Sequence, residues 1–288
     1  MPELPEVEAL VQDLARRLEG RAVVRVDIAA FSCLKTYEPP ITALSGGMVD
    51  GVHRHGKFLD IDVSGTHLVL HLARAGWVRW RDELPKTPAR PSSKSPLAAR
   101  VVLDNDAGLD ITEAGTRKSL ALYVVRAPAD VEGIARLGPD PLADEFTIDV
   151  LSDILQEAGR AQIKGVLRHQ GTIAGIGNAY SDELLHAARM SPFKPANSLD
   201  HTELETLYDA IRTVLGDAVI RSAGLAASEL KGEKKSHMAV HGRTGEACPV
   251  CGDTVREVSF ADSSLQYCAT CQTGGKPLAD RRLSRLLK

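Results

Sequence analysis

The chain has no long apolar run, no excess of basic residues and too few cysteines for a disulfide framework. No uninterrupted stretch of roughly 18 apolar residues occurs, so no membrane-spanning helix is predicted. The acidic N-terminus is unlike a signal peptide. The five cysteines are an odd number, which argues against a disulfide-based fold. These absences predict a soluble, cytoplasmic protein with no membrane association.

The charge balance gives only weak guidance about partners. Proteins that bind nucleic acids are usually basic, whereas this chain of 288 residues has a formal net charge of -3. The charge is uneven, because residues 226–288 hold ten Lys and Arg against seven Asp and Glu. A polyanion would therefore be bound mainly through the C-terminal part and through local grooves. The length suits about two domains.

The N-terminus allows two interpretations. Removal of Met1 would turn Pro2 into a secondary amine, and an α-amino group is roughly one-tenth neutral at pH 7. Such an amine attacks a sugar carbon to give an iminium ion, and Glu3 or Glu6 would supply the proton for the leaving group. Proline and early acids are also ordinary signals for the start of a helix. The residues alone favour the helix start and leave the chemistry open.

Short and partly alternating apolar runs follow the first predicted helix. Gly-rich breaks separate them, which is typical of an antiparallel sandwich or barrel. The Pro- and Ser-rich stretch 85–96 predicts a mobile loop inside this domain. The predicted strands are residues 23–29, 57–63, 67–72, 77–80, 100–104 and 120–125.

The pattern becomes helical after residues 138–141, Gly-Pro-Asp-Pro, where we place the domain boundary. A capping-box pattern from Asp200 to Glu203 predicts the start of one helix. The glycine turn from Ala174 to Asn178 leads into another, and its free N–H groups favour a phosphate. A plain connection between helices explains the same turn. The other predicted helices are residues 147–158, 161–169 and 178–188.

The end of the chain carries the strongest metal signal. The pairs Cys248/Cys251 and Cys268/Cys271 each have two intervening residues, and 16 residues separate the pairs. This spacing suits tetrahedral Zn²⁺ on four thiolates. Since protein fills all four positions, we predict one structural Zn²⁺ that decides whether this small segment folds. A basic tail, which either grips phosphates or is simply solvated, contains Lys276, Arg281, Arg282, Arg285 and Lys288.

Several motifs together resemble the formamidopyrimidine-DNA glycosylase and endonuclease VIII family of DNA repair enzymes, along essentially the whole chain. The resemblance implies an α+β fold. It consists of an N-terminal eight-stranded antiparallel β-sandwich with a leading helix, a helix-two-turn-helix domain and a four-cysteine zinc finger, with DNA between the domains. The motifs are Pro2-Glu3, Gly56-Lys57-Phe58-Leu59, Leu137-Gly138-Pro139-Asp140-Pro141-Leu142, Gly175-Ile176-Gly177-Asn178-Ala179-Tyr180 with Glu183, and Cys268-Ala269-Thr270-Cys271-Gln272.

The same resemblance assigns roles to individual residues. It implies that Pro2 is the nucleophile that forms a Schiff base with the sugar. Glu3 is then the principal proton donor and Glu6 a supporting acid. Lys57 matches a lysine that approaches the lesion phosphate, and Asn178 matches an asparagine that holds the DNA backbone. A solvated lysine at a strand end and a helix cap are the structural alternatives for these two.

Three positions depart from the family pattern. Ser263 stands where the finger usually has an arginine, five residues before its third cysteine. Arg74 replaces a methionine wedge, and the Arg-Phe wedge pair is absent around Arg117 and Lys118. An extruded base leaves a void that must be filled. Arg74, Arg117 and Lys118 are our candidates for that role, and specificity for oxidised guanine is open.

The sequence therefore predicts a bifunctional DNA glycosylase and abasic-site lyase. It would act as a monomer on double-stranded DNA with damaged, chiefly oxidised, bases in base-excision repair. Two alternatives stay open: a noncatalytic protein that binds damaged or structured DNA, and a specialised glycosylase for bulky or cross-linked lesions. The predicted domains are a catalytic β-sandwich over 1–131, a linker over 132–141, a helix-two-turn-helix domain over 142–227, a mobile lesion-recognition loop over 228–240 and a zinc finger over 241–288.

Overall fold

The computed structural model describes residues 1–91, 95–115, 117–260 and 263–279. The chain divides into two compact units. Unit 1 comprises residues 1–137 and 222–230, and unit 2 comprises residues 138–221 and 231–288. Among the described helices, none is long and apolar enough to cross a bilayer.

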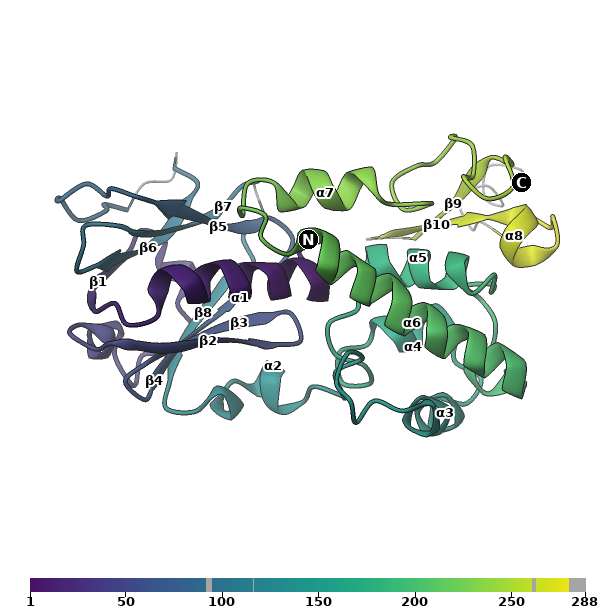
Figure 1. Cartoon of the computed structure of the whole chain (residues 1–288), viewed down its shortest axis with the longest axis horizontal. Helices are drawn as coiled ribbons and strands as arrows, with labels where there is room; N and C mark the ends of the chain where they lie inside the picture. Colours follow the sequence, from purple (N-terminus) through teal and green to yellow (C-terminus); the bar gives the residue numbers. More distant parts are fainter. Residues whose placement is uncertain (92–94, 116, 261–262, 280–288) are drawn as a thin grey trace. The chain divides into compact units, whose positions relative to one another are not determined.

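Unit 1 is a β-sandwich with a leading helix, α1 (Leu4–Leu18), drawn in purple in Figure 1. Its described strands form two four-stranded antiparallel sheets, in the orders β1-β6-β7-β5 and β2-β3-β4-β8. One apolar stripe of α1 shares a single hydrophobic core with both sheets, as its 3.6-residue spacing requires. The strands are β1 (Val23–Ile28), β2 (Val49–His55), β3 (Phe58–Val63), β4 (Thr66–His71), β5 (Gly76–Arg81), β6 (Leu97–Leu103), β7 (Gly108–Glu113) and β8 (Ala121–Val125).

The strand patterns in the sequence do not predict β2 or β7. Strand β2 is rich in His, Arg and Asp, so it lacks a simple apolar alternation. Strand β7 starts at Gly108, where an added Cβ would lie 2.0 Å from the carbonyl oxygen of Val101. Glycine is needed there because the neighbouring strand comes so close. A residue that suggests a turn in the sequence is thus part of the sheet.

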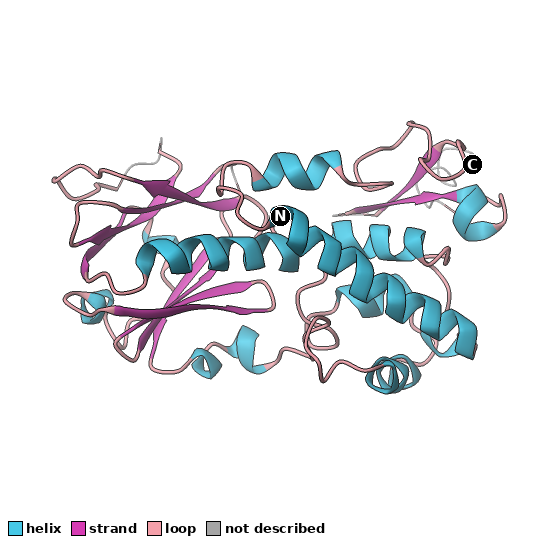
Figure 2. Cartoon of the chain, viewed as in Figure 1, coloured by secondary structure: helices cyan, strands magenta, loops and turns pink. Residues whose placement is uncertain are grey.

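Unit 2 begins with a bundle of helices, which Figure 2 draws in cyan. The predicted capping box is confirmed, because Asp200 and Glu203 exchange side-chain to main-chain hydrogen bonds of 2.9 and 3.1 Å. The glycine turn also leads into a helix that begins at Asn178. The helices of the core are α3 (Ile148–Glu157), α4 (Ile163–Arg168), α5 (Asn178–Ala187) and α6 (His201–Ser222).

The end of unit 2 is an antiparallel hairpin followed by a short helix, as expected for a zinc finger. The hairpin pairs Ser264 with Ser259 and Cys268 with Val255. Its elements are β9 (Val255–Ser259), β10 (Ser264–Cys268) and α8 (Ala269–Thr273). Of the predicted basic tail, Lys276 is described, whereas Arg281, Arg282, Arg285 and Lys288 lie outside the described residues.

The segment after α6 differs from the prediction in two ways. Residues 222–230 belong to unit 1, because Ala227 and Leu230 are buried in its core and the indole N–H of Trp77 donates to the Ala227 carbonyl at 2.8 Å. The predicted loop contains a helix, α7 (Leu230–Ser236), preceded by a 2.8 Å bond from the Ala226 amide to the Glu229 carboxylate. Residues 230–236 of the predicted loop are therefore helical. The stretch is short and mostly polar, so it lacks the apolar periodicity that would predict a helix.

The remaining short helices connect these elements. The helix α2 spans Glu132–Ala135 in unit 1. The single 3₁₀ turns are η1 (Phe31–Cys33), η2 (Ile41–Leu44) and η3 (Pro128–Asp130) in unit 1 and η4 (Ala196–Ser198) in unit 2. The predicted loop 85–96 lies between β5 and β6, and its described residues contain no helix or strand.

Candidate functional site

Two buried carboxylates stand at the beginning of α1. The main-chain amide of Glu3 donates a hydrogen bond of 2.8 Å to Oε2 of Glu6. Both side chains are 2% exposed, and Pro2 is buried, whereas Met1 is half exposed. Negative groups are favourable at a helix N-terminus because the helix dipole and the free N–H groups face them. With Met1 present, the Pro2 nitrogen is part of a peptide bond.

Lys57 lies on the turn between β2 and β3, and it is 7% exposed. Gly56, just before it, has a φ of +56°, a left-handed conformation that glycine adopts without strain. Burial, and next the nearby Lys57 ammonium, lower the pKa of His71 to about 4. The imidazole also lies against the Phe58 ring, with 4.7 Å between ring centroids. Lys57 therefore has a neutral imidazole as its neighbour.

An ion pair fixes this turn relative to α1. Nε of Arg54, on β2, lies 2.7 Å from the carboxylate of Glu8, and the Arg54 side chain is only 10% exposed. The same guanidinium donates to the Gly56 carbonyl at 3.4 Å. Neither Arg54 nor His71 is predicted from the sequence as a site residue. Arg54 lies near the end of β2, just before the turn, and His71 ends β4, where it pairs with Phe58 just after the turn.

The three predicted void-filling residues differ in their surroundings. Arg74 is exposed and follows Ala73, which has a positive φ of +49°. Arg117 is also exposed. Lys118 donates to the main-chain carbonyl of Glu113 at 2.6 Å, so its ammonium is engaged with its own loop. All three lie in unit 1 together with Pro2 and Lys57.

The Glu113 side chain organises the end of that loop. It is 3% exposed, and its Oε1 accepts hydrogen bonds from the amides of Ser119 at 2.6 Å and Leu120 at 2.9 Å. A buried carboxylate that accepts main-chain N–H groups holds the backbone firmly. The main chain directly after Lys118 is thus held in place.

Asn178 is the first residue of α5, in unit 2. Its side-chain Nδ2 donates to the Ser264 carbonyl of the hairpin at 2.8 Å. Its Oδ1 is the one buried side-chain polar atom without a hydrogen-bond partner among the described residues. An unsatisfied buried acceptor is costly. The Asn178 side chain thus contacts the hairpin and does not cap α5, whose N-cap residue is Gly177.

Lys164 supports the same helix and was not identified from the sequence. It is 5% exposed, and its Nζ lies 2.6 Å from Asp182 Oδ1, 2.8 Å from Ser181 Oγ and 3.1 Å from the Asn178 carbonyl. The other oxygen of Asp182 lies 2.8 Å from Nδ1 of His241. A buried ion pair with every donor satisfied restricts a helix to one position. The helix that carries Asn178 is held in this way.

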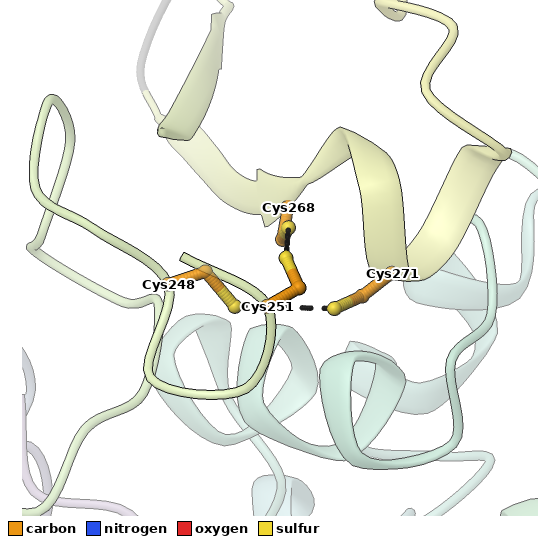
Figure 3. Close-up of side chains that lie close together, drawn as sticks. All are labelled: Cys248, Cys251, Cys268 and Cys271. Carbon is orange, nitrogen blue, oxygen red and sulfur yellow. Dashed lines mark hydrogen bonds between the residues drawn. The ribbon is translucent and has the colours of Figure 1, made fainter. Parts of the chain in front are cut away.

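The four predicted zinc ligands come together in unit 2 (Figure 3). Their sulfur atoms all lie within 4.8 Å of one another. The distance is 3.9 Å between Cys248 and Cys271 and 3.4 Å between Cys251 and Cys268. Tetrahedral Zn²⁺ with Zn–S bonds of about 2.3 Å needs sulfur separations of about 3.8 Å. The cluster therefore fits one structural zinc ion.

The environment of the four cysteine thiols also favours a bound cation. Burial raises the pKa of the Cys268 and Cys271 thiols, whereas the Asp253 backbone amide lowers the pKa of Cys251. Thiolates crowded in this way repel one another, and a bound metal ion removes that repulsion. Because four protein sulfurs complete a tetrahedron, zinc here holds the fold and leaves no position for substrate.

Three family descriptions match successive parts of the chain. Residues 1–122 match the formamidopyrimidine-DNA glycosylase N-terminal domain, and residues 137–229 match the formamidopyrimidine-DNA glycosylase H2TH domain. Residues 245–274 match the zinc finger found in FPG and IleRS. The zinc-finger match includes all four clustered cysteines.

Known relatives agree with these matches. A formamidopyrimidine-DNA glycosylase of Symbiobacterium thermophilum is 35% identical over 98% of this chain and 93% of its own length. An uncharacterized formamidopyrimidine-DNA glycosylase-like protein of Mycobacterium tuberculosis is 60% identical, over 53% of this chain and 94% of its own length. The chain therefore belongs to a class of DNA repair proteins with a zinc finger.

Solved structures place it within that class. The MutM (Fpg) protein from Thermus thermophilus has a TM-score of 0.79 at 32% identity, covering 96% of this chain and 100% of that one. The Lactococcus lactis Fpg bound to DNA with an abasic site has a TM-score of 0.81 at 25% identity, covering 94% of this chain and 99% of that one. The chain is a member of the formamidopyrimidine-DNA glycosylase family, and its relatives indicate a DNA glycosylase of base-excision repair.

Proposed function

We propose that this protein is a bifunctional glycosylase and abasic-site lyase that acts on damaged bases in double-stranded DNA through the Pro2 amine. The observation that carries the proposal is the set of buried groups at the start of α1. Pro2, Glu3 and Glu6 are shielded from water, and the two carboxylates are 2% exposed. Glutamate side chains are rarely buried to this degree.

In the proposed reaction, Met1 is first removed, so that Pro2 has a free secondary amine. Its lone pair forms a bond to C1′ of a flipped nucleotide, and the bond from C1′ to the base breaks, with the electron pair leaving on the base. The base takes up the proton that the Pro2 nitrogen loses. Glu3 gives a proton to the sugar ring oxygen as the ring opens, which leaves an iminium ion between Pro2 and the sugar. General acid catalysis of this kind contributes about 10²–10⁴-fold.

Strand cleavage follows from the same intermediate. The iminium ion acidifies the C2′ proton, a base removes it, and the 3′ C–O bond breaks with its electrons leaving on the phosphate. Water then releases the sugar remnant from Pro2. Glu6 holds the Glu3 main chain through its 2.8 Å hydrogen bond and thereby positions the proton donor.

The remaining predicted residues bind the DNA in this proposal. The buried ammonium of Lys57 binds a DNA phosphate. The neighbouring His71 is neutral, so it adds no second positive charge beside Lys57. Asn178, in unit 2, binds the DNA backbone. Arg74 or Arg117 fills the space left by the flipped base, since both are exposed and of sufficient length. The protein acts as a monomer.

Reductive trapping tests the proposal. Wild-type protein without Met1 is incubated with abasic-site DNA and borohydride, which reduces an iminium ion to a stable covalent adduct. We expect an adduct whose DNA is attached to the Pro2 nitrogen, as peptide mass analysis would show. A preparation that binds this DNA but gives no adduct would refute the assignment of Pro2 as the nucleophile. Glu19→Gln, an exposed change at the far end of α1, is the matched control.

One observation favours a second candidate, a noncatalytic protein that binds damaged DNA. The hairpin has Ser263 at the position of the usual finger arginine. Equal binding of damaged and intact duplex, without cleavage of either, would support this candidate. A third candidate is a glycosylase for bulky or cross-linked lesions, which a panel of lesion-bearing oligonucleotides separates from one for oxidised bases.

A further inference from the structure

We infer that His186 is a hydrogen-bond donor to the zinc-bound Cys248 thiolate and that this bond seats the finger on α5. Nε2 of His186 lies 3.3 Å from Sγ of Cys248. The two residues are 5% and 2% exposed, so the contact is shielded from water. His186 lies in the last turn of α5, which is otherwise part of the helical core.

The geometry identifies His186 as an outer partner rather than a fifth ligand. Among the described residues, the group whose donor atoms all approach one another contains only the four cysteines. Four thiolates already complete the tetrahedral coordination of Zn²⁺. A thiolate offers only lone pairs, so the contact is attractive when Nε2 carries the ring proton.

Such a bond has two consequences for the metal. Four thiolates around one Zn²⁺ leave an excess of negative charge, and a donor to one sulfur reduces their repulsion. The bond also fixes the rotamer of Cys248 before zinc arrives. Outer partners of metal ligands typically change metal affinity by about 10–100-fold.

The bond completes a row of three contacts along α5. At its first residue, Asn178 donates to the Ser264 carbonyl at 2.8 Å. In its middle, the Glu183 carboxylate accepts from the amides of residues 239, 240 and 241 at 2.6 to 3.0 Å. In its last turn, His186 meets Cys248. Glu183 and His186 are one turn apart and share a helix face, so α5 holds the finger from its first turn to its last.

Zinc retention in the full chain tests the inference. His186→Phe keeps the ring volume without the donor, and His186→Gln replaces it by an amide donor. We expect His186→Phe to weaken zinc binding about 10–100-fold, measured by transfer to a chromogenic chelator, and His186→Gln to recover part of the loss. The matched control is His201→Phe, because His201 lies on α6 in the same unit with an 80% exposed side chain. Its zinc retention should equal that of the wild type.

A second measurement does not depend on how the variants fold. Nuclear magnetic resonance of the wild-type zinc-loaded chain reports which nitrogen of His186 carries the proton. We expect the Nε2–H tautomer, with slow exchange of that proton with water. The Nδ1–H tautomer would overturn the inference, as would a His186→Phe variant that holds zinc as tightly as the wild type.

Discussion

The Glu3 amide and the Glu6 carboxylate are joined by a hydrogen bond of 2.8 Å in a region from which water is excluded. This one bond serves two purposes. It satisfies a free N–H at the start of α1, as a helix requires. It also holds the main chain of the proposed proton donor, Glu3, in one position. The helix start and the candidate catalytic site are therefore the same structure.

Glu3→Gln is expected to separate base removal from Schiff-base formation. The amide keeps the size of the side chain but donates no proton to the sugar oxygen. We expect excision of a damaged base to slow by about 100-fold or more. Borohydride trapping at a preformed abasic site should fall much less, because an abasic sugar also exists as an open-chain aldehyde, which Pro2 can attack without protonation of the ring oxygen. An equal loss in both assays would contradict the assigned role, and Glu19→Gln is the control.

Glu6→Ala should destabilise unit 1. The change leaves the buried Glu3 amide without its acceptor, which costs about 1–3 kcal/mol of unfolding free energy. Glu6→Gln keeps an acceptor oxygen and should lose less. Urea denaturation of both variants beside the wild type measures the difference. Equal stability of Glu6→Ala and Glu6→Gln would mean that the hydrogen bond contributes nothing.

His71 should make stability depend on pH in mildly acidic solution. Its pKa is about 4 in the folded chain against an ordinary value of 6.5. Between these values the unfolded chain binds a proton that the folded chain does not. The unfolding free energy therefore falls as the pH drops from 6.5 to 4, by up to about 3 kcal/mol. In His71→Gln this part of the decrease should be absent, as denaturation at a series of pH values would reveal.

Lys57→Met should change two unrelated measurements at once. Removal of the ammonium takes away the second cause of the low His71 pKa, so that pKa should rise, while burial keeps it below 6.5. Loss of one phosphate contact should reduce the slope of log affinity against log salt by about 0.9. The exposed Lys86→Met is the control for both. An unchanged salt slope would exclude a phosphate contact at Lys57.

Ser263→Arg should add a phosphate contact to the hairpin. Ser263 directly precedes Ser264, whose carbonyl accepts from Asn178, so the new cation would stand beside that contact. We expect tighter binding of abasic-site DNA and a salt slope steeper by about 0.9. Ser198→Arg, an exposed change elsewhere in unit 2, should leave the slope unchanged. If both variants behave alike, the added charge acts nonspecifically.

Local patterns in the sequence predicted much of this protein. The pairs Cys248/Cys251 and Cys268/Cys271 predicted the metal cluster, because each knuckle is closed by residues three apart. The capping residues from Asp200 to Glu203 and the glycine turn before Asn178 marked helix starts for the same reason. The interactions concerned lie within a few residues of one another, so neighbouring side chains determine them.

Where the patterns failed, distant parts of the chain decide the structure. Gly108 belongs to a strand because Val101 approaches it closely from β6. Residues 222–230 join unit 1 because Trp77 and the core of that unit bind them, although they follow a helix of unit 2. Neither relation leaves a local signal in composition or spacing.

By itself, the sequence determined which reactive groups the chain contains: a proline at position 2 followed by two acids, four cysteines with zinc-ligand spacing, and a glycine turn before an asparagine. Only the tertiary structure decided which groups act on one another. Arg54 reaches Glu8 across 46 positions of the chain, and His186 reaches Cys248 across 62. Such pairs depend on how helices and sheets pack, and packing is a property of the whole core rather than of any short segment.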